Sequence, residues 1–328
     1  MIKVYDEFTQ LKEVILGNIN KELVKYVPKD EQSLILDIFD QTIEDLDAIQ
    51  KIYQDNGIIV HRPKLSSDYS NIIFTPNSTT KGVRNPLSPR DAFIVIGNTL
   101  LETAGYRADM MFEHLFYKNI FLEQYKNNPC KWIKMPTPSY DKNCVDELGV
   151  SNAEPIIDAA QIMRLGDCLI VSNTGAVNEQ GIDWMRRHFP DYKIVEADLK
   201  GHIDAQIKII RPGLMITPYT KSDLPKCLQN YDIIKCNDNN NDLITNGMMF
   251  RDDDVENTFP SCAITSLNEN CVFVYEHYKE VYKEFIKQLE KHNVEVIFVP
   301  LRHQHWFNQG ITCLTMELHR AGDKEKYV

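Results

Sequence analysis

One local pattern occurs five times in the sequence, and this repetition constrains the fold more than any other feature. In each repeat a helical or polar segment ends at Asn, Pro or Asp and runs into a short apolar strand. The repeats span residues 53–63, 125–136, 186–198, 228–236 and 290–300. Three of them follow a hairpin pattern, at residues 92–102, 161–172 and 206–218, whose central dipeptides Gly-Asn, Gly-Asp and Pro-Gly are typical of tight turns. A recurring hairpin, helix and strand favours a cyclic repeat architecture over a doubly wound sheet.

Helical periodicity is clear in two segments. Residues 31–55 place most of their apolar side chains on one stripe, namely Leu34, Ile35, Ile38, Ile43, Leu46, Ile49 and Ile52. Residues 276–291 repeat that spacing, and residues 107–124 predict a third helix with more aromatic content. No linker rich in Pro, Gly or Ser divides the chain, so we expect residues 1–328 to form a single domain.

Charge and composition narrow the class of function. A formal net charge of −11 would repel nucleic acid and anionic membrane surfaces, so we expect neither as a partner. No apolar run approaches the roughly 20 residues of a membrane helix, and no secretory signal is visible. The cysteines form no CxxC pair and no zinc spacing, which indicates reduced thiols in a cytoplasmic enzyme. The polar segment 237–256 is interpreted as an exposed loop, with a substrate lid as the alternative.

Acidic residues recur at the starts of the hairpins. Asp91, Asp158 and Asp204 each precede a predicted strand. A single Asp in such a position is usually a turn cap. Three of them converging at one end of a cyclic fold would instead form a cation site. His202 lies two residues before Asp204, and on a strand the two side chains would share a face, which favours acid–base chemistry.

Cys313, in the stretch NQGITCLTMELHR, is the candidate nucleophile. Most cysteines in such a run are inert core residues, and a thiol becomes reactive only when a base is near or its pKa is lowered. The local sequence is compatible both with an inert core cysteine and with a reactive nucleophile. The preceding segment 301–310 is rich in aromatic residues and histidines and could line a pocket. His303 and His305 lack a third ligand, so no metal site is expected.

Longer stretches identify a family. EPIIDAAQIMRLGD, GIDWMRRHFPDYKI and HIDAQIKIIRPGLMITP, in this order, resemble the central region of the amidinotransferase family, whose typical member uses glycine. PRDAFIVIGNTLLET, the opening EFTQLKEVILGN and the closing GITCLTMELHRAG resemble further segments of that family. The resemblance covers nearly the whole chain. It implies an α/β fold of the pentein superfamily: a five-bladed α/β propeller of ββαβ modules, with pseudo-fivefold symmetry, around an acidic pocket.

The resemblance also implies roles for the site residues. Cys313 would be the nucleophile and His202 the general acid and base, while Asp158 would orient His202. Asp91 and Asp204 would bind a guanidinium, whose planar N–H edges match carboxylates. The implied reaction moves the amidino group of L-arginine through an amidino-Cys313 intermediate to a primary amine and releases ornithine, with no cofactor. A homodimer is expected on the same ground.

Three departures from the family pattern bear on the substrates. The residue before the nucleophile is Thr312 where His is common, and a Gly pair is reduced to Gln309-Gly310. Lys221 follows a strand where the glycine-dependent member has an Arg for the substrate carboxylate. One alternative is a hydrolase of the deiminase or dihydrolase type, in which water resolves the same intermediate. Another is a catalytically dead protein that only binds guanidino compounds.

Overall fold

The structure is a computed structural model. It describes residues 1–328 except 66–71, 75–78, 82–83, 141–144, 147–148, 151–153, 200, 237–261, 263, 277–278, 280–282 and 308. The predicted loop 237–256 therefore lies outside the described residues.

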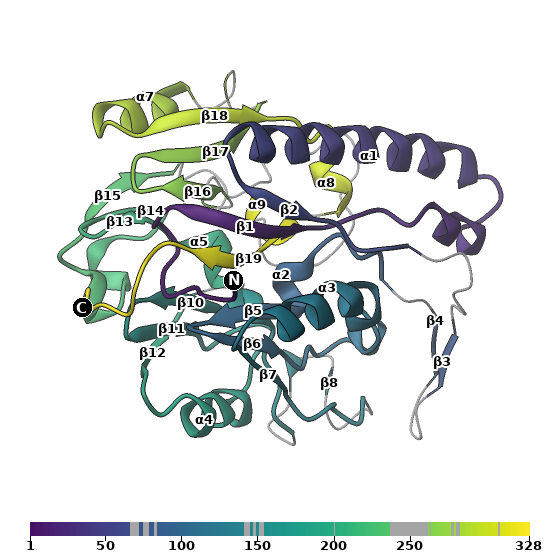
Figure 1. The fold of residues 1–328 in the computed structure, drawn as a ribbon, viewed down its shortest axis with the longest axis horizontal. Coiled ribbons are helices and arrows are strands. Elements are labelled where there is room, and N and C mark those ends of the chain that lie inside the picture. The colour runs from purple at the N-terminus through teal and green to yellow at the C-terminus, as the bar shows by residue number, and fades with distance from the viewer. Residues whose placement is uncertain are drawn as a thin grey trace.

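Five mixed sheets of three strands each dominate the described part of the chain (Figure 1). In every sheet an antiparallel hairpin is extended by a parallel third strand. Four sheets follow the chain in order: β5–β6–β7 (Phe93–Ile96, Thr99–Glu102, Lys131–Lys134), β10–β11–β12 (Ile162–Leu165, Cys168–Ser172, Lys193–Ala197), β13–β14–β15 (Lys208–Arg211, Leu214–Thr217, Asp232–Lys235) and β16–β17–β18 (Thr265–Asn268, Cys271–Tyr275, Glu295–Val299). The predicted five-module α/β architecture is confirmed.

The fifth sheet joins the two ends of the chain. The C-terminal strand β19 (Thr315–Arg320) pairs antiparallel with β1 (Leu11–Leu16), and β1 pairs parallel with β2 (Ile59–His61). Backbone hydrogen bonds extend the closure, since Lys3 N–H donates to Leu318 O at 2.9 Å and Val4 N–H donates to Gly97 O at 2.9 Å. Because one module is built from both termini, the ring of modules closes on itself.

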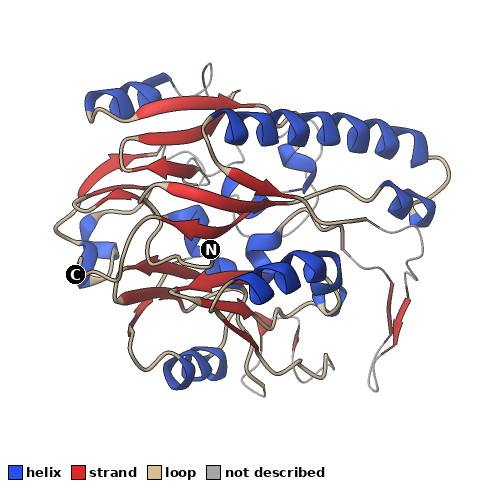
Figure 2. Cartoon of the chain, viewed as in Figure 1, coloured by secondary structure: helices blue, strands red, loops and turns tan. Residues whose placement is uncertain are grey.

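Helices connect the second and third strands of most modules and lie toward the periphery (Figure 2). They are α1 (Gln32–Asp55), α3 (His114–Asn127), α4 (Glu179–His188) and α7 (Lys283–Lys291). The β14–β15 crossover uses two 3-10 turns instead, η4 (Lys221–Asp223) and η5 (Lys226–Leu228). Further elements are η1 (Lys21–Tyr26), η2 (Ala108–Met110), α8 (Gln304–Phe307) and the short hairpins β3–β4 (Ile72–Phe74, Thr79–Lys81) and β8–β9 (Val145–Asp146, Gly149–Val150).

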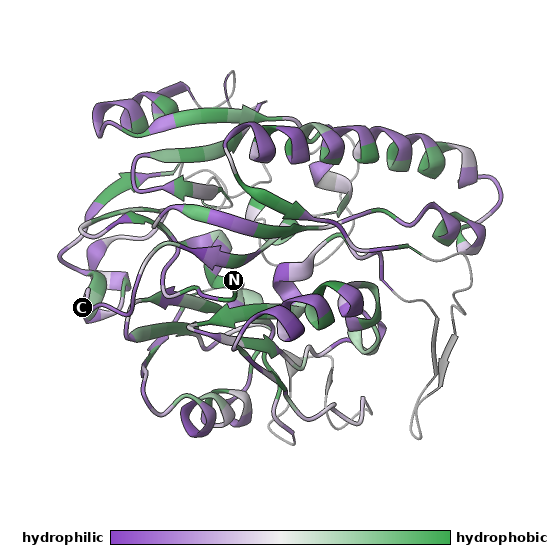
Figure 3. Ribbon diagram, viewed as in Figure 1, coloured by the Kyte–Doolittle hydropathy of each residue, from purple (hydrophilic) through white to green (hydrophobic). Residues whose placement is uncertain are grey.

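The predicted helices are found with shifted ends. Helix α1 matches residues 31–55 closely, and its buried face includes Ile38, Leu46 and Ile49, whereas Leu34 is exposed. Helix α3 begins seven residues later than predicted, because residues 108–110 form the separate turn η2. Helix α7 is described from Lys283 on. These helices present polar outer faces, as expected when one stripe packs on a sheet (Figure 3).

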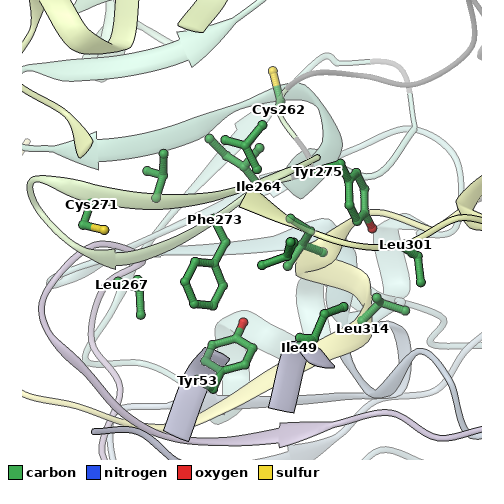
Figure 4. Packing of buried hydrophobic residues seen from close by; sticks show 14 of the residues in the cluster. Ile49, Tyr53, Cys262, Ile264, Leu267, Cys271, Phe273, Tyr275, Leu301 and Leu314 are labelled. Atoms are coloured by element: carbon green, nitrogen blue, oxygen red, sulfur yellow. The ribbon is translucent and has the colours of Figure 1, made fainter. Parts of the chain in front are cut away.

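The largest apolar cluster of the described residues includes side chains of α1, of β1 and of the modules β13–β15 and β16–β18. Tyr53 of α1 and Phe273 of β17 meet edge to face, with ring centroids 4.7 Å apart (Figure 4). Leu314, the residue after the candidate nucleophile, belongs to the same cluster. The nucleophile turn is therefore anchored by core packing on one side.

Candidate active site

Short helical turns precede the first strand of four modules, and these turns carry the candidate residues. They are α2 (Pro89–Ala92) before β5, η3 (Ala159–Gln161) before β10, α5 (Ile203–Gln206) before β13 and α9 (Ile311–Leu314) before β19. Turn α2 contacts both α9 and η3, and η3 contacts α5. The cyclic arrangement thus brings segments more than 200 residues apart to one place, near the middle of the molecule (Figure 1).

Each turn contributes at least one candidate residue, either at its N-cap or within the turn. Asp91 lies within α2, Asp158 is the N-cap of η3, His202 is the N-cap of α5, Asp204 lies within α5 and Cys313 lies within α9. The expectation that His202 and Asp204 share a strand face is wrong, because residues 203–206 are helical and β13 begins only at Lys208. Both side chains still reach the cluster, since a turn at the start of a strand faces the same end of the ring.

The histidine and one carboxylate form an ion pair. His202 Nε2 lies 3.6 Å from Asp158 Oδ2, and the His202 side chain is 32% exposed while that of Asp158 is 3% exposed. Burial alone would lower the pKa of His202. The neighbouring Asp158 and the charges of Asp91 and Asp204 outweigh it and raise this pKa to about 9. The imidazole is therefore protonated at neutral pH and can act as an acid.

Cys313 is 8% exposed, and its thiol is held in the neutral form. Burial raises its pKa well above the usual value, and the charges of Asp204 and Asp91 add to this. A backbone hydrogen bond from Gly310 and the charge of Arg90 act in the opposite direction. A bound cation that neutralised the carboxylates would lower the pKa of the thiol. The thiolate of Cys313 is therefore expected to form when a cationic ligand is bound.

Several carboxylate oxygens in the cluster are buried without a hydrogen-bond partner among the described residues. They are Asp91 Oδ1, Asp158 Oδ1 and both oxygens of Asp204. Burial is also the largest cause of the raised pKa of Asp158 and of Asp204. Unpartnered buried carboxylates are costly unless a ligand satisfies them. A planar cation with several N–H donors, such as a guanidinium, supplies that complement.

Arg90 connects two of the turns and was not singled out by sequence reasoning. Its guanidinium donates to Ile162 O at 2.5 Å and also to Ala159 O, so it ties α2 to the adjacent module. It is 2% exposed, and its charge lowers the pKa of Asp204. Its place beside Asp91 in the sequence was the only available signal.

Thr312 is buried next to the nucleophile, whereas Lys221 is exposed. Thr312 Oγ1 donates to Ile264 O at 2.8 Å and anchors α9 to the segment before β16. Lys221 is the first residue of η4 and is exposed, and no described contact joins it to the cluster. Its predicted role in binding a substrate carboxylate stays a prediction.

A cavity adjoins the cluster on the Asp158 side. Gly105 and Met110 line it together with Glu102, His114 and Lys134. A Cβ atom added to Gly105 would lie 2.7 Å from Asp158 Oδ1 and 2.9 Å from Met110 Sδ. Only a glycine therefore lets the backbone pass so close to this carboxylate.

The described part of the chain also bears on metal binding and on membrane insertion. Within it, no set of three or more His, Cys, Asp or Glu side chains is placed to hold a metal ion. His303 Nε2 instead lies 2.9 Å from Gln41 Oε1. Among the helices of the described ranges, none is both long and apolar enough to cross a membrane.

Comparison with known proteins finds amidinotransferases among the relatives of this chain. No family model matches the sequence. The chain is 27% identical over 367 residues to a mitochondrial glycine amidinotransferase of Xenopus laevis, covering 98% of this chain and 84% of that protein. It is 26% identical over 362 residues to inosamine-phosphate amidinotransferase 1 of Streptomyces glaucescens, covering 100% and 99%.

Solved structures give the same fold. An amidinotransferase of the saxitoxin biosynthetic pathway from Microseira wollei superposes with a TM-score of 0.83 at 23% identity, covering 100% of this chain and 99% of that one. A dimethylarginine dimethylaminohydrolase superposes with a TM-score of 0.62 at 12% identity, covering 94% and 100%.

Proposed function

Since the chain belongs to the amidinotransferase family of the pentein superfamily, we propose that it moves the amidino group of L-arginine to a primary amine through a covalent amidino-Cys313 intermediate. The observation that carries this proposal is the meeting of Cys313, His202 and three buried acids on equivalent turns of four modules.

The first half-reaction begins with binding of the arginine guanidinium. Asp204 and Asp91 accept its N–H groups, and its positive charge offsets the carboxylates that keep Cys313 neutral. The thiol then loses its proton to solvent, and the thiolate attacks the guanidino carbon. His202, protonated at neutral pH, gives its proton to the departing amine. The C–N bond breaks, ornithine leaves and an amidino group remains on sulfur.

The second half-reaction reverses the proton flow. His202 is now neutral and takes a proton from the incoming primary amine, whose nitrogen attacks the amidino carbon. The C–S bond breaks, and the thiolate is released as the guanidino product forms. Asp158 keeps the imidazole oriented and stabilises its charged form in both halves.

Known relatives use different acceptors, as their names state: glycine for one and an inosamine phosphate for another. For this chain the acceptor is assigned only by class, as a primary amine. Thr312 bonds to Ile264 O and does not provide an imidazole beside the nucleophile, which distinguishes its pocket from the usual family pattern.

A product assay tests the transfer against its hydrolytic alternative. The protein is incubated with L-arginine alone and then with glycine, lysine and other amines, and the products are analysed by mass spectrometry. We expect repeated turnover to ornithine and a new guanidino compound only when an acceptor is present, because L-arginine alone can release about one ornithine per Cys313. Citrulline or ammonia formed without an acceptor would assign the protein to the hydrolases instead.

A further inference from the structure

An arginine of the chain itself occupies part of the candidate guanidinium site. Arg84 lies in the segment before α2, and its Nη1 is 2.9 Å from Asp91 Oδ2. Its Nη2 is 3.0 Å from Glu113 Oε2, just before α3. Arg84 N–H also donates to Asp109 O at 3.4 Å. One oxygen of a carboxylate assigned to substrate is therefore already bound to a resident guanidinium.

Burial makes this bridge a fixed element and not a surface ion pair. Glu113 is fully buried, Asp91 is 5% exposed, and the side chain of Arg84 is 20% exposed. Asp91 Oδ1 and Glu113 Oε1 have no described hydrogen-bond partner. Asp91 thus offers a substrate one oxygen, whereas Asp204 offers two.

We propose that Arg84 is a positioning residue that, held by Glu113, fixes Asp91 so that a substrate guanidinium takes one oxygen from Asp91 and both from Asp204. The proposal rests on the proposed function, because it assigns the ligand of these carboxylates. The sequence motifs do not indicate this role for Arg84, and it differs from the role in carboxylate binding that was predicted for Lys221.

Charge balance explains why the site needs this cation. Without Arg84, the buried carboxylates of Asp91 and Glu113 would lose the cation that bridges them, and Glu113 would bind a proton more readily. Burial already raises the pKa of Glu113 to about 7, although Arg84 opposes that rise. Arg84 bridges the two carboxylates, fixes Asp91 Oδ2 and leaves Asp91 Oδ1 available to a substrate guanidinium.

Charged or titratable groups lie on both sides of Asp91. On the Arg84 side these are Asp109, Glu113 and Tyr117. On the other side they are Asp158, His202, Asp204 and Cys313. This set contains more acids than cations. Removing the positive charge of Arg84 therefore makes proton uptake by the buried acids more favourable.

The test measures binding of L-arginine to Cys313→Ala, which cannot react, with and without changes at Arg84. Isothermal titration calorimetry is run over a range of pH on C313A, C313A/R84M and C313A/R84K. C313A/R186M is the control, because Arg186 pairs with Asp183 and Glu196 at an exposed site. For R84M we expect binding roughly 10- to 100-fold weaker at neutral pH and recovery at higher pH, as buried acids lose their proton. For R84K we expect a loss of roughly 3- to 10-fold with the wild-type pH dependence, since Lys keeps the charge but not the fork.

Two results would overturn the proposal. Tighter binding in R84M would show that Arg84 competes with substrate, and equal binding at all pH values in R84M and C313A would show a structural role only. If C313A/R84M does not fold, the C313A/R84K variant decides instead. Binding of L-arginine by C313A/R84K that equals binding by C313A would then overturn the proposal. Failure of C313A itself to bind L-arginine would contradict the proposed function and not the role of Arg84.

Discussion

His202 Nε2 lies 3.6 Å from Asp158 Oδ2, although the two residues belong to neighbouring modules and are separated by a complete ββαβ unit. The pair exists because both modules place a turn at the start of their first strand, and these turns meet. It gives the cluster of turns that carries the neutral Cys313 thiol a protonated imidazole as well.

Replacing Asp158 by Asn tests this pair. Without the carboxylate, the pKa of His202 is expected to fall from about 9 toward its ordinary value of 6.5. The high-pH limb of kcat for ornithine release should move down accordingly, and kcat should decrease roughly 100- to 10,000-fold, as when acid–base catalysis is lost. Asp191→Asn, at an exposed position, is the control. An unchanged pH limb would show that another group holds the imidazole charge.

Asp204→Asn tests how the carboxylates control the thiol. Because Asp204 raises the pKa of Cys313, its removal should lower that pKa and make alkylation by iodoacetamide faster at a given pH. The rate is followed for the Cys313 peptide by mass spectrometry, so other cysteines do not interfere. Asp232→Asn, at the exposed start of β15, should leave the rate unchanged. A slower reaction in D204N would contradict the electrostatic account.

Much of this architecture could be predicted from the sequence. All five helix-to-strand repeats correspond to third strands of sheets, and the three predicted hairpins are present with their turns. Local pattern was enough, because strand periodicity and turn dipeptides are short-range signals. The β16–β17 hairpin, which turns at Glu269-Asn270, was missed because it lacks a Gly or Pro dipeptide.

The sequence singled out residues that the structure places on neighbouring turns, whereas their roles stay predictions and their local geometry was predicted less well. Asp91, Asp158 and Asp204 recur at module starts, which is visible in the sequence, but the helical turns that carry them are only three or four residues long. Arg84 and Glu113 were missed, because they lie 29 positions apart and no local pattern connects them. Long-range ion pairs of this kind are decided by the fold.

Gly105→Ala probes the close approach of the chain to Asp158. The added Cβ would collide with Asp158 Oδ1 and Met110, so the carboxylate must move. We expect activity to decrease roughly 10-fold or more, because small displacements of positioning groups have large effects. Gly213→Ala, where φ is +85° and no atom of the described residues lies within 4 Å of the added Cβ, should cost only about 1 kcal/mol of stability. Equal activities of the two variants would argue against a precise placement of Asp158.

Glu13→Gln tests the contact that joins β1 to β2. Although burial raises the pKa of Glu13, bonds to His61 and the N-terminus lower it to about 2 in the folded protein. The carboxylate therefore contributes stability above its ordinary pKa of 4.5, and this contribution is lost as the pH falls toward 2. We expect E13Q to lower the free energy of unfolding by about 1–3 kcal/mol at pH 7. In urea titrations the difference from wild type should shrink with acidification, and a constant difference would disprove the charge effect.

The central claim is that Cys313 carries the amidino group between donor and acceptor. The protein is mixed with L-arginine in the absence of amine, quenched in acid and digested, and the Cys313 peptide is measured by mass spectrometry. The account predicts an increase of about 42 Da on Cys313 together with released ornithine, and loss of this mass when an accepting amine is added. An unmodified Cys313 in a protein that still converts arginine would contradict the claim.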